Sequence, residues 1–395
     1  MNPKSARAAF LIAFGHLTIE LCGNYLPVVY PILIQTLKLN FTQIGAIALV
    51  ASAAVTLPQP LLGYLSDRWH ADRLVALSVV WIGLAMGLVG FTWNYPSLLL
   101  LVALGGLGSA AFHPPGAVIA SAGGGGTRKG AAMSIFSVGG NVGAAFSPLL
   151  MTAGIAWLGL HGTSILMPIA LPIGLFLYFQ LGQIARSRTA QSSMQPSSMR
   201  NGLALGLVLI VMVVMARSWF QVSLMTYLPA WIESQGRSVA AGGQMLFVLL
   251  ICVGVGSLAG GTLSDRIGRW QVLALSILLL GPAQWLFVSR LGPLQTLMLG
   301  FMGFLIGASF PVSIVMAQEA WPWSAGVASG LVMGLGWLPG GLGAYVTGLI
   351  ADHFSLAVGL RTLILPPMVG AACSLLYAAS QRSQAQAAPR IEIPK

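Results

Sequence analysis

Apolar residues fill the chain in long runs that are separated by short polar or Pro- and Gly-containing breaks. A helix needs about 20 predominantly apolar residues to cross the hydrocarbon core of a bilayer. The runs reach this length, and they lack the period-two alternation of strands. They predict twelve membrane-spanning helices, near residues 8–36, 42–66, 73–92, 97–122, 130–155, 163–184, 201–232, 239–264, 270–289, 293–319, 323–350 and 361–380.

One polar stretch, residues 186–200, is rich in Ser and Gln and divides six predicted spans from six. We therefore expect an all-α polytopic membrane protein with an N-terminal six-helix bundle over residues 1–185 and a C-terminal six-helix bundle over residues 201–380. Residues 186–200 would form a cytoplasmic linker between the bundles. Residues 381–395 are expected to form a disordered cytoplasmic tail.

Composition supports a membrane protein, because 56% of the 395 residues are apolar and only 7% are charged. Soluble domains carry charge on about a quarter of their residues. The net charge of +11 suggests a nucleic-acid partner, but the basic residues are scattered and lack stacking aromatics, so we expect none. Cys22, Cys252 and Cys373 lie far apart without nearby His ligands, and we expect neither a metal nor a cofactor.

The basic residues also predict the orientation in the membrane. Of the 19 Lys and Arg residues, Arg217 lies inside a span, and only Lys38, Arg237, Arg290 and Arg361 fall in loops on the side opposite the N-terminus. Basic residues accumulate on the cytoplasmic side of membrane proteins. We therefore place both termini in the cytoplasm and the chain in a bacterial inner (plasma) membrane, with nothing that requires more than a monomer.

A short motif occurs twice, 198 positions apart, as Gly63-Tyr-Leu-Ser-Asp67-Arg68 and Gly261-Thr-Leu-Ser-Asp265-Arg266-Ile-Gly268-Arg269. A repeat at equivalent positions of both halves indicates duplication of a bundle. The motif resembles the signature loop of the major facilitator superfamily, in which two bundles rock around a central site. The resemblance implies conformational gating loops at Gly63, Asp67, Arg68, Gly261, Asp265, Arg266 and Arg269; the alternative is an ordinary positively charged turn.

Two glycine-rich stretches lie in the fifth and eleventh predicted spans. They read Gly139-Gly140-Asn141-Val-Gly143 with Ser147-Pro148, and Gly334-Leu-Gly336-Trp-Leu-Pro339-Gly340-Gly341. Both loosely resemble the glycine-proline motif of facilitator-type antiporters. Close helix packing or a kink would explain the same residues.

The first five spans also resemble the fosmidomycin resistance protein family of efflux pumps. The resemblance rests on Gly15-His16 with the acidic residue that follows it, Gln43-Ile-Gly45, Gln59-Pro60-Leu-Leu-Gly63-Tyr64, Phe112-His113-Pro114 and Gly139-Gly140-Asn141-Val-Gly143. It implies proton-driven export of an antibiotic-like or metabolic solute.

Charged side chains in mid-membrane are costly and mark functional sites. His16, Glu20 and Asn24 are spaced four apart on one face of span one, and Arg217 and Gln221 repeat this spacing in span seven. Given the 198-residue offset, Glu20 and Arg217 lie at equivalent depths. We expect the two residues to meet across a central cavity.

This placement suggests a coupling mechanism. Glu20 would carry protons together with His113 and His16, and Arg217 would bind an anionic solute. Further candidates for substrate binding are Asn24, Gln221, Trp219, Tyr25 and Asn141. The alternative is a permanent Glu20–Arg217 ion pair that fixes a helix contact. Pro114 and Pro115 are expected to break the helix after His113.

Other energy sources and activities find no support in the sequence. No Gly-x-x-x-x-Gly-Lys-[Ser/Thr] loop for ATP occurs, and no catalytic constellation is present, so we expect a transporter and not an enzyme. A channel or a sensor is a further alternative. The favoured function is proton-coupled efflux (antiport) of a small organic solute, anionic or antibiotic-like, by alternating access. The runner-up is uptake of an organic anion or metabolite by proton symport.

Overall fold

Every element of the computed structural model is helical, over the described residues 3–68, 70–123, 129–185, 205–289, 292–321, 332 and 336–387. Within these residues ten segments are long and apolar enough to cross a membrane. One of the ten, Ala132–Gly182, includes most of two long α-helices, of 30 and 20 residues. The predicted count of twelve spans stays a prediction, and the predicted linker at 186–200 lies outside the described residues.

Several predicted spans consist of two helices separated by a short break. In chain order the elements are α1 (Pro3–Gly23), α2 (Leu26–Leu37), α3 (Phe41–Thr56), α4 (Gln59–Arg68), α5 (Ala71–Gly87), η1 (Val89–Phe91), α6 (Tyr95–Gly123), α7 (Lys129–Leu158), η2 (Gly159–Ile165), α8 (Leu166–Ala185), α9 (Leu205–Ser234), α10 (Val239–Ile267), α11 (Arg269–Ser289), α12 (Pro293–Ala320), α14 (Leu338–His353), α15 (Leu356–Thr362) and α16 (Leu365–Ala387).

Three local expectations are wrong. Helix α6 continues through Pro114 and Pro115, since a membrane helix tolerates the loss of a few backbone bonds when its neighbours support it. The repeated motif lies on helices, at the end of α4 and in the last turns of α10, and only Gly268 leaves the helix, with a φ of 100°. Helix α16 runs to Ala387, beyond the expected start of the tail at residue 381; residues 388–395 lie outside the description.

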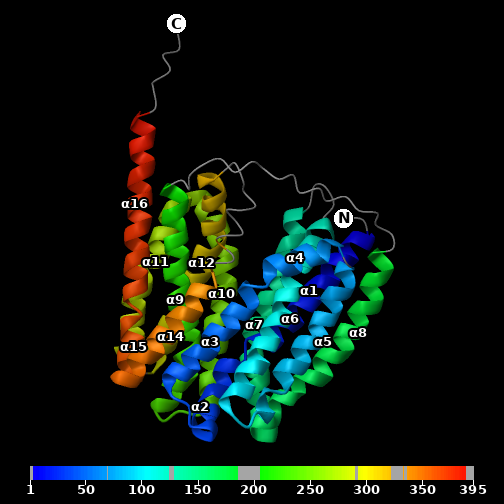
Figure 1. Cartoon of the computed structure of the whole chain (residues 1–395). Helices are drawn as coiled ribbons and strands as arrows, with labels where there is room; N and C mark the ends of the chain where they lie inside the picture. The colour runs from blue at the N-terminus through cyan, green and yellow to red at the C-terminus, as the bar shows by residue number, and fades with distance from the viewer. Residues whose placement is uncertain are drawn as a thin grey trace.

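The helices pack in two groups with matching internal contacts (Figure 1). We call α1–α8 the N-group and α9–α16 the C-group. In the N-group α1 packs on α7, α3 on α6, and α5 on both α6 and α8. In the C-group α9 packs on α14, α10 on α12, and α11 on both α12 and α16. Equivalent helices thus make equivalent contacts, as expected for a duplicated bundle; the division into domains at 186–200 remains a prediction.

The two groups touch each other chiefly through three helix pairs, α3 with α14, α7 with α10, and α2 with α9, with smaller contacts of α3 with α9 and of α2 with α10. We call the end of the molecule where α1 begins and α16 ends the terminal face, and the opposite end, near α2 and α15, the far face (Figure 1). Hydrogen bonds join the groups at the far face, where the Tyr227 hydroxyl donates to the Phe41 carbonyl oxygen at 2.9 Å. The structure is therefore a conformer that is closed at the far face.

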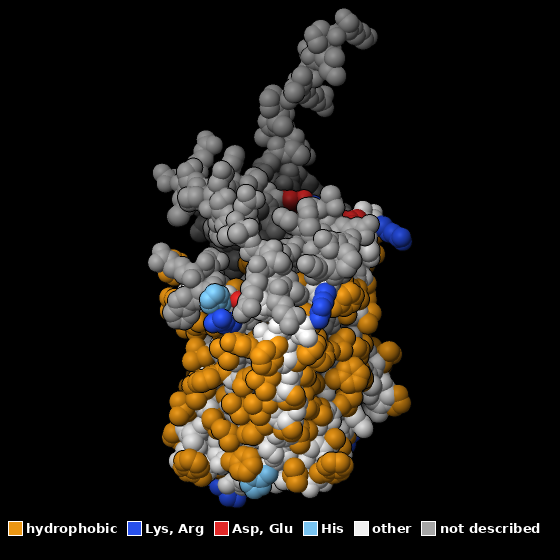
Figure 2. All heavy atoms as spheres, turned by 90° about the vertical axis from the view of Figure 1, so that its right-hand side faces the viewer, with side chains coloured by type: hydrophobic (Ala, Val, Ile, Leu, Met, Phe, Trp, Pro, Cys, Tyr) orange, Lys and Arg blue, Asp and Glu red, His pale blue; other side chains and the backbone are white. Residues whose placement is uncertain are grey.

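The surface is that of a membrane protein. On the face shown in Figure 2, apolar side chains form a broad band, and the visible Lys and Arg side chains lie toward its two ends. Large aromatic side chains stand exposed near the far face, among them Trp157 (89% exposed), Trp93 (79%) and Phe354 (75%). Such residues anchor a protein at the boundary between lipid and water. The chain is an integral, multi-pass membrane protein.

Candidate functional site

A cavity of about 170 Å³ lies between the two groups. Most of its lining is apolar, from α1, α2, α3, α5 and α6 of the N-group and from α9 of the C-group. Its polar lining residues are Glu20, Asn24, Tyr30, Ser52, Ser109, His113, Thr226 and Trp337. None of the described residues that line it is Lys or Arg. The one carboxylate in the lining, Glu20, therefore dominates its electrostatics.

Glu20 lies one turn before the end of α1, where the chain breaks before α2. Pro27, in the first turn of α2, fits a helix start because it has no N–H to leave unpaired. The break leaves Asn24 beside the last turn of α1, and its side-chain nitrogen donates to Glu20 Oε2 at 2.7 Å and to the Glu20 carbonyl oxygen at 3.0 Å. Asn24 therefore holds one carboxylate oxygen and orients the other.

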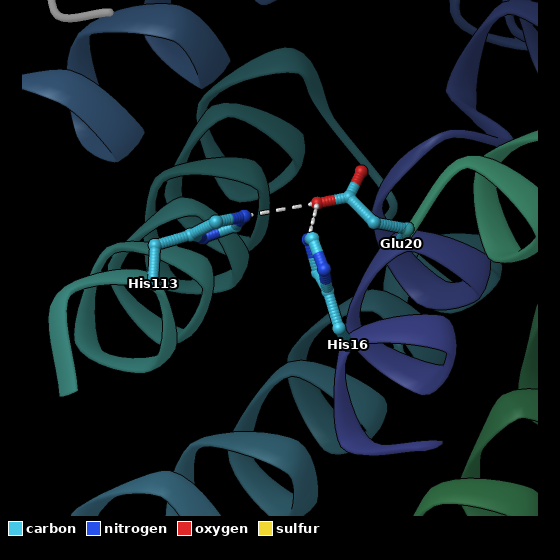
Figure 3. A group of neighbouring side chains, drawn as sticks. All are labelled: His16, Glu20 and His113. Atoms are coloured by element: carbon cyan, nitrogen blue, oxygen red, sulfur yellow. Dashed lines mark hydrogen bonds and ion pairs between the residues drawn. The ribbon is translucent and has the colours of Figure 1, made fainter. Parts of the chain in front are cut away.

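His113 reaches the free oxygen from α6. Its Nε2 atom lies 3.1 Å from Glu20 Oε1 (Figure 3). Its Nδ1 atom lies 2.7 Å from the Ser109 carbonyl oxygen. A carbonyl oxygen can only accept, so Nδ1 carries a hydrogen and donates to it. The histidine is thereby fixed with Nε2 directed at the carboxylate.

His16, one turn before Glu20 on α1, repeats this arrangement. Its Nε2 atom lies 3.5 Å from Glu20 Oε1, and its Nδ1 atom lies 2.8 Å from the Phe136 carbonyl oxygen of α7. The imidazole stacks on the Phe136 ring with centroids 4.0 Å apart. Gly140 makes room for it, because a Cβ at this position would lie 2.4 Å from the His16 ring. We call His16, Glu20 and His113 the acid–imidazole cluster.

The hydrogen bonds of the cluster set a lower limit on the number of protons that it holds. With both Nδ1 atoms protonated, each Nε2 of a neutral ring presents a lone pair to the carboxylate. Two lone pairs repel each other at 3.1 Å, so the contact between His113 and Glu20 requires a proton on Nε2 or on Oε1. The cluster can therefore hold one shared proton and accept more. This is the arrangement expected of a proton-binding site within the membrane.

The same atoms form the group among the described residues with the geometry of a metal site, because the three donor atoms lie within 4.8 Å of one another. Two imidazole nitrogens and a carboxylate oxygen are donors that Zn²⁺ accepts. The sequence predicted no metal, whereas these three donors suit a cation as well as a proton.

Arg217 does not meet Glu20, contrary to expectation. It is 3% exposed, lies outside the cavity lining, and has its guanidinium carbon 4.8 Å from the centre of the Phe310 ring of α12. Its Nε atom has no hydrogen-bond partner, and no ion pair joins it to an acid among the described residues. Glu20 is occupied by two histidines within its own group, which removes the reason for an ion pair across the cavity.

The other predicted substrate-binding residues, apart from Asn24, lie outside the cavity lining as well. The Tyr25 hydroxyl is buried and donates to the Met86 carbonyl oxygen at 2.6 Å. Trp219 packs where Gly343 leaves room, Gln221 contacts Met225 at 3.9 Å, and Asn141 faces Gly254 across the α7–α10 contact. In this conformer these side chains serve helix packing.

The predicted gating residues lie toward the terminal face. Gly63 packs against Pro114, Asp265 and Arg266 are exposed, and Arg269 forms an ion pair with Glu319. A Cβ on Gly261 would meet nothing within 4 Å. The side chains of Asp67 and Arg68 lie outside the description, as does part of the glycine-rich stretch around Gly334. The gating role of these residues remains a prediction.

Two groups that position the cluster were not among the predicted residues. Ser109 lies four residues before His113, and its hydroxyl oxygen lies 3.3 Å from His113 Nδ1, beside its carbonyl oxygen; a hydroxyl at this spacing on an apolar helix could have revealed it. The Phe136 carbonyl had no signal, since every residue carries the same group. Both act on the imidazole nitrogen that faces away from Glu20, so they decide which nitrogen is available for protons.

Comparison with known proteins gives one consistent result. The Major Facilitator Superfamily model matches residues 12–344. The chain is 30% identical to the fosmidomycin resistance protein of Escherichia coli over 93% of both chains, and 29% identical to an uncharacterized MFS-type transporter, YfnC, of Bacillus subtilis over 93% of this chain and 91% of that one. The fold matches a bacterial homologue of the human lysosomal transporter Spinster with a TM-score of 0.81 at 15% identity, covering 97% of this chain and 98% of the other.

Proposed function

The chain belongs to the Major Facilitator Superfamily, as its sequence motifs predicted, and from this premise we propose that it is a secondary transporter that exports a small organic solute in exchange for protons. Its relatives are membrane transporters and not enzymes. The proposal includes a bacterial inner membrane, cytoplasmic termini and a monomeric working unit.

The observation that carries the proposal is the acid–imidazole cluster at the wall of the cavity. Glu20 is 21% exposed and His113 27% exposed, so both reach the cavity while most of their surface is buried. A group that is buried, paired and still accessible can take up a proton from one side and release it to the other when the cavity changes its opening. Glu20, His113 and His16 are accordingly the proposed proton carriers.

The charge of the cluster determines which solutes can be exchanged for protons. A neutral or cationic solute that donates a hydrogen bond to Glu20 competes with protons for the same carboxylate. Binding of the solute then releases protons, which is the coupling that antiport requires. Antiport of such a solute needs no residue beyond the cluster and the apolar walls.

An anionic solute has the opposite relation to the cluster. It is attracted when both imidazoles are protonated, so the anion and the protons bind together, and the cluster alone would then couple them as symport. Because no Lys or Arg is among the described lining residues, an anion in the cavity would depend on the protonated imidazoles for its positive partner. This dependence supports the second candidate, proton-coupled uptake of an organic anion. Export of an anion by antiport needs a separate cation, for which we propose Arg217.

Transport in everted membrane vesicles with an acidic interior tests the proposal. Candidate solutes, beginning with fosmidomycin because the chain resembles the fosmidomycin resistance protein, are added outside while the pH gradient is followed. An antiported solute dissipates the gradient in the wild type and leaves it intact in Glu20→Gln.

The control is Glu233→Gln, an acid at the far face away from the cavity, which should behave as the wild type. A solute that is transported equally by the wild type and Glu20→Gln, without any change in the gradient, would refute proton coupling through Glu20. Accumulation in right-side-out vesicles on acidification of the outside would instead establish symport.

A further inference from the structure

The start of α3 at the far face is held by residues of the other group. A helix begins with four backbone N–H groups that have no partner within the helix. In α3, the Gln43 N–H donates to the Asn40 side chain at 2.8 Å, and the Asn40 N–H donates to the Gln43 side-chain oxygen at 3.0 Å. Asn40 and Gln43 therefore satisfy half of the helix start from within the N-group.

The remaining two N–H groups donate to a residue of the C-group. The Phe41 N–H donates to Asp352 Oδ1 at 2.9 Å, and the Thr42 N–H donates to Asp352 Oδ2 at 2.8 Å. The Thr42 hydroxyl donates to the same Oδ2 atom at 2.6 Å. Asp352 is the second-last residue of α14, so the carboxylate lies at the C-terminal end of one helix and at the N-terminal end of another. A negative charge is stabilised at the N-terminal end.

Phe41 is also held through its carbonyl oxygen. The Tyr227 hydroxyl of α9 lies 2.9 Å from the Phe41 carbonyl oxygen and 2.8 Å from the Ala344 carbonyl oxygen of α14. Both backbone groups of Phe41 thus bind the C-group, one through Asp352 and the other through Tyr227. Tyr227 itself is fully buried, so water does not compete for this contact.

Glycines allow the backbones to approach closely at the same place. A Cβ on Gly45 would lie 2.6 Å from the Ala344 carbonyl oxygen, and a Cβ on Gly348 would lie 2.4 Å from the Phe41 carbonyl oxygen. Helices α3 and α14 therefore touch through their backbones here. Separation of the groups at the far face breaks the bonds of Phe41 and Thr42 to Asp352 together with the bond of Phe41 to Tyr227, and it leaves the bond of Tyr227 to Ala344 within the C-group.

We propose that Asp352 and Tyr227 form a latch on Phe41 and Thr42 that stabilises the conformer closed at the far face. The latch must break whenever the cavity opens to that face. This inference rests on the proposed alternating access, but it does not depend on the solute or on the coupling ion. The latch sets the resting conformer of the empty transporter, and its loss shifts the population toward the conformer that is open at the far face.

Hydrogen–deuterium exchange of the solute-free protein in lipid nanodiscs tests the latch with Asp352→Asn. The expected result is faster exchange at the start of α3 by roughly three- to tenfold, the range expected for one charge at a helix terminus. The same increase is expected at the far ends of α7 and α10, where Gly243 packs on Thr152 away from Asp352. This second site separates the opening of the whole face from the loss of two local bonds.

Glu233→Gln is the matched control, because it removes one negative charge at the same face. Glu233 of α9 accepts from the Gln35 amide of α2 at 3.2 Å, across the two groups, and the oxygen of a Gln side chain can still accept this hydrogen bond. This variant should exchange like the wild type. Tyr227→Phe, which keeps the buried ring and removes the hydroxyl, should open the face as Asp352→Asn does. Faster exchange confined to Phe41 and Thr42, or no change in either variant, would overturn the proposal. The hydrogen–deuterium exchange is measured without solute, so it would give the expected result even if the protein exchanged no protons for solute. Failure of the proposed function would show only in the vesicle transport experiment.

Discussion

Helices α1 and α9 occupy equivalent places in their groups, and each carries one charged residue in the middle of the membrane. Glu20 of α1 is contacted by His16, His113 and Asn24, all from the N-group. Arg217 of α9 lies against the Phe310 ring and leaves its Nε atom without a partner in the described structure. The acid thus lies within a hydrogen-bond network at the cavity, whereas the cation is buried outside the cavity lining.

This difference indicates a division of labour between the groups. A duplicated fold supplies two equivalent positions, and the side chains around each decide what it does. The surroundings of Glu20 suit a group that exchanges protons in every cycle. Those of Arg217 suit a permanent cation, which needs either an anionic solute or a change of conformer to compensate its buried charge.

The largest effect is expected from Glu20→Gln, which removes the only cavity-lining carboxylate among the described residues. Proton-driven transport should fall to background, because the amide cannot carry a proton through the cycle. Exchange of labelled for unlabelled solute, which requires no net proton movement, should persist. Measuring both activities on the same vesicles separates lost coupling from lost folding, and loss of both would show that Glu20 is needed for binding or structure.

Arg217→Met tests the other half of the comparison. If Arg217 binds an anionic solute, affinity should fall by about 10- to 100-fold, the range for one charge-assisted bidentate contact. The melting temperature should be unchanged or higher, because an apolar side chain of similar length replaces a buried charge. Binding and thermal unfolding of the purified variant are the measurements. Unchanged affinity for an anionic solute would leave Arg217 without a role in recognition.

Gly140→Ala should disturb the cluster without changing any charged residue. The new methyl group would lie 2.4 Å from the His16 ring, so the imidazole must leave its place over Phe136. We expect a loss of about 1–3 kcal/mol in stability from overpacking and a several-fold slower proton-coupled rate. Gly254→Ala is the matched control in α10, where the methyl group would make an ordinary contact at 3.5 Å with Asn141. Equal effects of the two variants would argue against a role for His16.

The smallest effect is expected from Asn24→Leu. It removes the donor that holds Glu20 Oε2 and keeps the size of the side chain. A hydrogen bond to a charged group contributes about 1.5–3 kcal/mol, but the half-buried carboxylate can turn toward the cavity, so we expect only a few-fold slower transport. Initial rates over a range of pH are the readout. A complete loss of transport would instead assign Asn24 to solute binding.

The sequence predicted the parts of this picture that depend on local pattern. Apolar runs of membrane length predicted the helices, and the duplicated Gly-x-x-Ser-Asp-Arg motif predicted the family that the comparisons confirm. The spacing of His16, Glu20 and Asn24 placed three side chains on one face, and the structure brings them together.

The remainder depended on tertiary structure. The expected Glu20–Arg217 contact failed because depth along two helices does not determine which way each side chain faces. His113 and Glu20, which pair in the structure, are 93 residues apart in the sequence. The Phe136 carbonyl could not be predicted, because every residue has a backbone carbonyl. The Asp352 contact with the start of α3 spans more than 300 residues, from one group to the other.

The central claim is that the acid–imidazole cluster binds protons on the Nε2 side of both histidines. ¹⁵N NMR of histidine-labelled protein measures this directly, with His16→Gln and His113→Gln to assign the signals. Both rings should keep a hydrogen on Nδ1 over the whole pH range, and all gain and loss of protons should occur at Nε2 as the pH is changed. A neutral His113 with its hydrogen on Nε2 and a bare Nδ1, or signals that do not respond to pH in the wild type, would contradict the assignment of the proton site to this cluster.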